Sequence, residues 1–67
     1  MTEWQKRVVE EKLELDDKTC KLTAFIFSSA FEEELSVEDQ NLLLRQREIM
    51  IEYSDQLMLR IERFTDD

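Results

Sequence analysis

The segment VEDQNLLLRQREIMIEYSDQLMLRIERF, residues 37–64, has the most regular apolar pattern of the chain. Its hydrophobic residues recur at alternating three- and four-residue steps, like the a and d positions of a coiled coil. The pattern predicts one helix over about residues 37–64, roughly 40 Å long at 1.5 Å per residue. The predicted seam, which includes two polar exceptions, consists of Leu43, Gln46, Met50, Tyr53, Leu57, Arg60 and Phe64.

Further apolar residues flank this seam on both sides. Leu44, Ile51 and Met58 follow it by one residue, and Leu42 and Ile49 precede it by one. A single partner helix cannot cover so wide an arc. Two helices of a 67-residue chain also enclose too small a core to offset the entropy of ordering them. We therefore expect the chain to assemble into a symmetric oligomer.

A first helix is predicted over about residues 3–27. Thr2 with Gln5 forms a capping-box pattern at its start, and Ser36 with Asp39 marks the start of the second helix. The pair Asp16 and Asp17 could cap a fresh helix start, so the sequence leaves open a kink there. The predicted apolar stripe, interrupted at Asp16 and Thr23, consists of Val9, Leu13, Cys20, Ala24, Phe27 and Phe31.

The chain contains no Gly and no Pro, which favours helix nearly throughout. Ser28, Ser29 and the acidic run after Phe31 are the best linker candidate, and they place a turn over about residues 28–36. The sequence therefore predicts an all-α fold, in which residues 1–67 form a single antiparallel helical hairpin domain.

Basic and acidic residues are separated along the sequence. The nine basic residues avoid residues 22–44, and an acidic run lies in the predicted turn, so a hairpin should gather its cations at its open end. The net charge of −8 disfavours long nucleic acid and membrane surfaces as partners. A small anion needs only a few converging cations, which an acidic protein can supply locally.

The sequence lacks the residues that several functional classes require. The chain has no His, no CxxC and no Gly-rich loop, so we expect no metal site, no cofactor and no enzymatic activity. Cys20 cannot form an internal disulfide, fits a reducing compartment and is predicted to be a small buried thiol. No signal segment or membrane span is recognisable, and the cytoplasm is the expected location.

A few residues could bind an anion. Arg60 is the most suggestive, because a guanidinium in an apolar seam needs a partner; the alternative is an ion pair with the first helix or a neighbouring chain. Lys21 and Thr23 supply a cation and a hydroxyl two residues apart. Trp4 could stack on a base or pack beside Phe64, and the sequence does not decide between these. Tyr53 is expected in the core.

The chain resembles a known family in the order of its motifs. KLTAFI (residues 21–26), LLLRQ (42–46), EYS (52–54) and RIERF (60–64) are similar to the hairpin domain shared by phage anti-CBASS and anti-Thoeris nucleotide sponges. The resemblance covers nearly the whole chain. It implies a protein that binds cyclic oligonucleotides of bacterial antiviral defence in the infected host and withholds them from their effectors without degrading them.

The resemblance also implies an assembly and site residues. Members form compact oligomers, often hexamers, with dinucleotide pockets between protomers and trinucleotide pockets on threefold axes. Lys21 and Thr23 match the phosphate-binding lysine and threonine, and Trp4 matches a stacking aromatic. Arg60, and less directly Arg7, would face the trinucleotide. The alternative function is a small structural or regulatory coiled-coil protein that binds a host or phage protein through its apolar arc.

Overall fold

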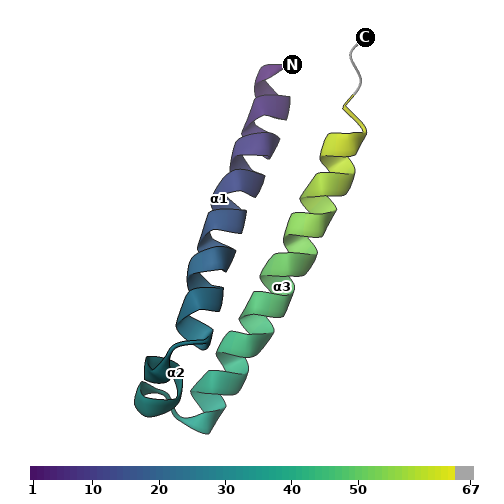
Figure 1. The fold of residues 1–67 in the computed structure, drawn as a ribbon. Helices are drawn as coiled ribbons and strands as arrows, with labels where there is room; N and C mark the ends of the chain where they lie inside the picture. The colour runs from purple at the N-terminus through teal and green to yellow at the C-terminus, as the bar shows by residue number, and fades with distance from the viewer. Residues whose placement is uncertain (65–67) are drawn as a thin grey trace.

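The fold is a helical hairpin. A computed structural model describes residues 1–64, with α1 at Glu3–Ile26, α2 at Ser29–Glu34 and α3 at Val37–Glu62. α1 and α3 lie side by side in opposite directions, and α2 lies at the turn that joins them (Figure 1). The molecule measures 52 × 14 × 14 Å. The predicted all-α antiparallel hairpin is confirmed, and we call its two ends the open end and the turn end.

The helix starts follow from their caps. The Thr2 Oγ1 atom accepts a hydrogen bond from the Gln5 backbone N–H, and the Gln5 side chain accepts one from the Thr2 N–H. Ser36 accepts a hydrogen bond from the backbone N–H of Asp39 at the start of α3. Both caps satisfy backbone donors that have no partner within the helix. α1 continues through Asp16, whose carboxylate bonds to other side chains, so no new helix starts there.

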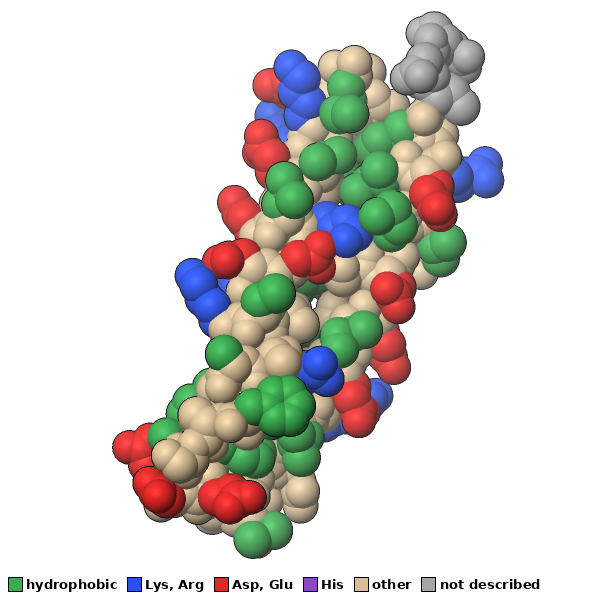
Figure 2. Space-filling view, viewed as in Figure 1, with side chains coloured by type: hydrophobic (Ala, Val, Ile, Leu, Met, Phe, Trp, Pro, Cys, Tyr) green, Lys and Arg blue, Asp and Glu red, His purple; other side chains and the backbone are tan. Residues whose placement is uncertain are grey.

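The turn contains a short helix that the sequence did not predict. Phe31 in α2 is buried and packs edge-to-face on Phe25, with ring centroids 6.1 Å apart. This aromatic contact attaches the acidic segment to the end of the hairpin. Acidic side chains gather at the turn end (Figure 2), where the exposed carboxylates belong to Glu32, Glu33, Glu34, Glu38 and Asp39.

The seam of α3 differs from the prediction at every second position. Leu57 has no exposed surface, and Leu43, Met50 and Phe64 are half-buried, as expected. The intervening positions were wrong: Gln46, Tyr53 and Arg60 are exposed, and the residues that face α1 are Arg47, Ser54 and Ile61.

The apolar stripe predicted for α1 was also wrong. Leu13 is 64% exposed and Phe27 is 83% exposed, and Cys20 and Ala24 are exposed as well, so the prediction of a buried thiol fails. Of that stripe, Phe31 in α2 is buried and Val9 is half-buried, as expected. The face that meets α3 contains buried or half-buried residues at heptad spacing: Val8, Lys12, Leu15, Asp16, Thr19, Leu22, Thr23 and Ile26.

Polar pairs explain this choice of face. The Ser54 hydroxyl donates a hydrogen bond to Asp16 over 2.5 Å, and Lys12 donates to the other oxygen of Asp16 over 2.7 Å. Nearer the turn, Arg47 Nε donates to the Thr23 hydroxyl over 2.7 Å. Within residues 1–64 no buried side-chain nitrogen or oxygen lacks a partner. The polar residues that appeared to interrupt a stripe therefore hold the two helices in register.

Asp16→Asn should lower the melting temperature at pH 7 by about 5 °C, because it removes a charged partner of Lys12 and weakens one hydrogen bond. The Lys12 and Ser54 hydrogen bonds hold the pKa of Asp16 below its ordinary value of 3.8. Its stabilising contribution is therefore complete above pH 3.8 and is lost as the pH falls through the lower folded-state pKa.

Melting curves followed by circular dichroism between pH 7 and pH 2 would check this. The difference between wild type and Asp16→Asn should shrink with acid. A constant difference across that range would show that the Asp16 charge contributes nothing, and Asp17→Asn, at an exposed carboxylate, is the matched control.

The hairpin leaves a broad apolar flank uncovered. The residues of this flank each follow a seam residue by one position. In an antiparallel pair, that shift directs the side chains of both helices to the same side of the hairpin. Hydrophobic side chains of both helices are visible together on the face shown in Figure 2. We call this surface the apolar flank; its members on α1 are Leu13, Cys20, Ala24 and Phe27, and those on α3 are Val37, Leu44, Ile51 and Met58.

Candidate functional site

The basic residues do not all lie at the open end. Thr23 is close to the end of α1, and its hydrogen bond to Arg47 places that arginine in the half of the molecule nearer the turn. Lys21 and Arg45 lie in the same half. The prediction that every cation gathers at the open end is therefore wrong, and the structure offers two separate basic regions.

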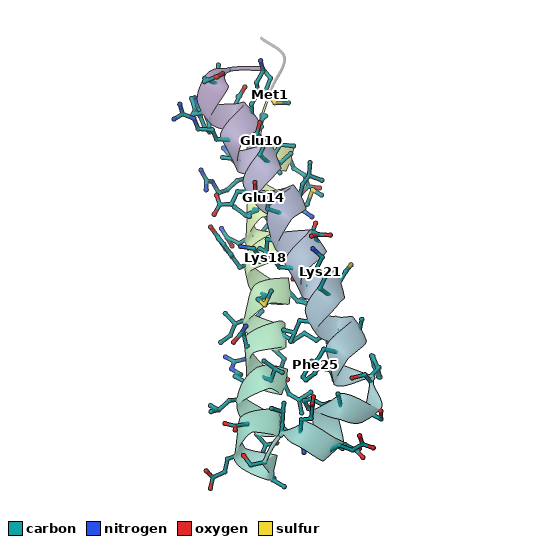
Figure 3. All side chains as sticks on the ribbon, turned by 90° about the vertical axis from the view of Figure 1, so that its left-hand side faces the viewer. Met1, Glu10, Glu14, Lys18, Lys21 and Phe25 are labelled. Atoms are coloured by element: carbon teal, nitrogen blue, oxygen red, sulfur yellow. The ribbon has the colours of Figure 1, made fainter. Side chains whose placement is uncertain are left out.

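Lys21 lies on the outer side of α1, away from α3. It belongs to a column of labelled residues along that side, with Glu14, Lys18 and Phe25 (Figure 3). Its side chain is 77% exposed, and Nζ lies 3.0 Å from a carboxylate oxygen of Asp17. Such an exposed pair contributes little to stability, so the ammonium group can exchange its partner for another anion.

Thr23 points in a different direction from Lys21. Two residues along a helix correspond to about 200° of rotation, and Thr23 faces α3. Its hydroxyl accepts from Arg47 and donates to the Thr19 carbonyl oxygen over 2.8 Å. Lys21 and Thr23 therefore do not converge within one hairpin. Arg47 was not among the candidate residues predicted from the sequence, although its place seven residues before Ser54 put it on the seam.

Trp4 packs at the open end. Its ring meets Phe64 edge-on, with centroids 5.2 Å apart, so the packing alternative for Trp4 is confirmed. The residue remains 53% exposed, which leaves ring surface for another contact. Seventeen residues of helix, about 26 Å, separate Trp4 from Lys21. The two cannot contact one small ligand from the same hairpin.

Arg60 lies beside the seam and not within it. It precedes Ile61 by one residue, as Arg7 precedes Val8, and in an antiparallel pair this shift puts both arginines on one side. That side is opposite the apolar flank, and we call it the charged flank. Within residues 1–64 neither guanidinium lies within ion-pair distance of a carboxylate.

Tyr53 lies on the charged flank as well, and its predicted place in the core was wrong. Its side chain is exposed, and its hydroxyl donates a hydrogen bond to Glu11 across the two helices. This hydrogen bond raises the pKa of Tyr53, and the charge of Arg60 partly opposes the effect. Arg60 therefore lies close enough to the Tyr53 hydroxyl for their charges to interact. The structure thus places Arg60 near Tyr53 on the charged flank, and Arg7 lies on the same side of the hairpin.

The side chains of both basic regions suit the binding of an anion. Arginine and lysine supply several hydrogen-bond donors and positive charge, which suit phosphate oxygens. In residues 1–64 no group of three Cys, Asp or Glu side chains could hold a metal ion. None of the three helices has an apolar stretch long enough to cross a membrane.

Comparison with known families gives one result. A model of the family described as Sequestin matches residues 2–63. The chain belongs to the Sequestin family. Sequestin is the name of the anti-CBASS cyclic-nucleotide sponges, so the resemblance found in the sequence motifs is confirmed. No curated protein and no solved structure matches the chain. Membership in Sequestin points to sequestration of a small signalling molecule.

Proposed function

We propose that this Sequestin protein binds cyclic di- and trinucleotide second messengers in the infected bacterial cell and withholds them from their effectors without degrading them. The observation that carries the proposal is the family match over residues 2–63. The exposed cations support it, because each cyclic nucleotide presents one phosphodiester per base. Lys21, Arg7 and Arg60 offer donors that such phosphates accept.

The proposal includes self-association, as a homohexamer. Among residues 1–64 only Val8, Phe31, Ser54 and Leu57 are buried, while the apolar flank, apart from the half-buried Ile51, is exposed to solvent. Burial of that flank between copies would supply the apolar area that one hairpin lacks. Lys21 and Thr23 point in different directions, and Trp4 is far from both. If these residues share a ligand, they must come from more than one protomer.

Two pocket classes follow from the two basic regions. Lys21 and Thr23, with Trp4 from another copy, would belong to a cyclic-dinucleotide pocket between protomers. Arg60 and Arg7 would face a trinucleotide where several charged flanks meet at the open ends. The separation of these regions along the hairpin allows both ligands to bind at once.

The first test is the thermal shift of the purified protein with a panel of cyclic di- and trinucleotides. A ligand that binds only the folded state and is present at 100 times its Kd stabilises the protein by about 2.7 kcal/mol, which raises the melting temperature by about 10–20 °C. The bound nucleotide should be recovered intact after denaturation. No shift with any member of the panel would contradict the proposal, and recovery of a cleaved product would indicate an enzyme.

The apolar flank favours one alternative, a coiled-coil protein that binds a host or phage protein. In that case Lys21→Ala and Arg60→Ala should leave protection against the host defence intact, and a specific protein should be recovered in a pull-down. Under the proposed function both substitutions reduce that protection.

A further inference from the structure

Arg47 has donors that the hairpin does not use. It is half-buried between α1 and α3, and its Nε–H is bonded to Thr23. A guanidinium carries five N–H donors, and none of the other four has a hydrogen-bond partner within residues 1–64. No carboxylate in that range lies within ion-pair distance. The terminal nitrogens are thus oriented by Nε and open to an anion.

The Thr23 hydroxyl, in contrast, has no unused hydrogen-bond donor. Its single proton is directed to the Thr19 carbonyl oxygen at 2.8 Å, and its oxygen accepts the Arg47 Nε–H at 2.7 Å. Thr23 has no second proton to donate to a phosphate oxygen. To bind a phosphate directly it would have to break its bond to Thr19. The hydroxyl is therefore suited to holding Arg47 in place.

We propose that Arg47 is the phosphate-binding donor in the basic region nearer the turn, and that Thr23 is a positioning residue that acts through Arg47. The inference rests on the proposed function and names a residue of that site. The ligand group is a phosphodiester, which a guanidinium binds with two parallel hydrogen bonds. The surrounding surface suits this pairing: Ala24 and Phe27, which follow Thr23 by one and four residues, are exposed and uncharged.

The test is a double-mutant cycle on binding, with the panel nucleotide that stabilises the wild type most as the probe. Arg47→Met keeps the apolar stem and removes the donors, and should weaken Kd at least about tenfold. Thr23→Val removes the hydroxyl at nearly constant shape, and should weaken Kd about fivefold. Thr23→Ser should bind like wild type. In the Arg47→Met background, Thr23→Val should have no further effect.

The outcomes separate the possibilities. If Thr23→Val still weakens binding in the Arg47→Met background, Thr23 contacts the phosphate itself and the inference fails. If Arg47→Met binds like wild type, the inference fails while the proposed function stands. A wild type that binds no panel member overturns both. If Arg47→Met does not fold, Arg47→Lys repeats the test, because it keeps the positive charge and removes the Nε–H that bonds to Thr23.

Arg45→Met is the matched control. Arg45 lies two residues away, is exposed and bonds to Glu48 on its own helix at 3.0 Å. Equal losses with Arg45→Met and Arg47→Met would assign the effect to net charge and overturn the inference. Circular dichroism and light scattering should give wild-type helicity and mass for every variant that enters the cycle.

Discussion

Leu57→Asp should unfold the hairpin. Leu57 is the one fully buried side chain among residues 1–64, and it belongs to the seam of α3. Replacement of a buried leucine by a small residue alone costs about 2–5 kcal/mol, and an unpaired carboxylate adds a desolvation penalty. The total approaches the whole stability of a small domain. The far-ultraviolet circular dichroism signal of helix should be largely lost at 25 °C and pH 7.

Leu59→Asp is the matched control. Leu59 lies two residues further along α3 and is 57% exposed, so the same change there should alter stability by no more than about 0.5 kcal/mol. A soluble, fully helical Leu57→Asp protein with the mass of the wild type would show that the seam has been placed on the wrong face.

Lys21→Glu should abolish dinucleotide binding while helicity and mass stay at wild-type values. The side chain is 77% exposed and its one ion pair among residues 1–64 is with Asp17 on the same helix, so we expect the fold not to depend on it. Reversal of the charge replaces an attraction to phosphate with a repulsion, and Kd should rise by at least about 100-fold. Isothermal titration with the panel nucleotide that binds the wild type would measure this.

Lys18→Glu separates a specific contact from general electrostatics. Lys18 lies on the same outer side of α1, one turn away, and the substitution changes the net charge equally (Figure 3). Binding should fall much less than with Lys21→Glu. Equal losses would indicate that only the overall charge matters, and dissociation of an oligomer by Lys21→Glu would show that the lysine is structural.

The sequence predicted the hairpin well because its caps and turn are local. Thr2, Ser36 and the acidic run each act on backbone within a few residues, which a linear pattern can reveal. The seam was harder to predict, since each helix carries two adjacent apolar stripes. Hydrophobicity favoured the stripe through Leu13 and Phe27, whereas the hairpin packs the one through Asp16 and Thr23.

The same limit applied to the candidate site. A polar residue on a seam is acceptable only when a partner 24 or 38 residues away meets it, as Arg47 meets Thr23 and Ser54 meets Asp16. That information lies in the pairing and not in either helix alone. Arg47 was therefore overlooked, and Arg60, one residue off the seam, was placed on it. Lys21 and Trp4 were chosen as candidates from the sequence motifs, and the structure places them in different regions of the hairpin.

The acidic turn end bears on the kinetics of capture. Five exposed carboxylates lie on α2 and on the first turn of α3, and the chain carries a net charge of −8. An anionic ligand is therefore repelled at long range and attracted only near the cations. Salt screens the distant repulsion more than a close, partly buried contact. The association rate of the anionic ligand should then increase as the ionic strength rises. A basic nucleotide-binding protein usually shows the reverse. The acidic turn end would repel the ligand before any contact forms, so the ligand would approach the hairpin from the side away from α2.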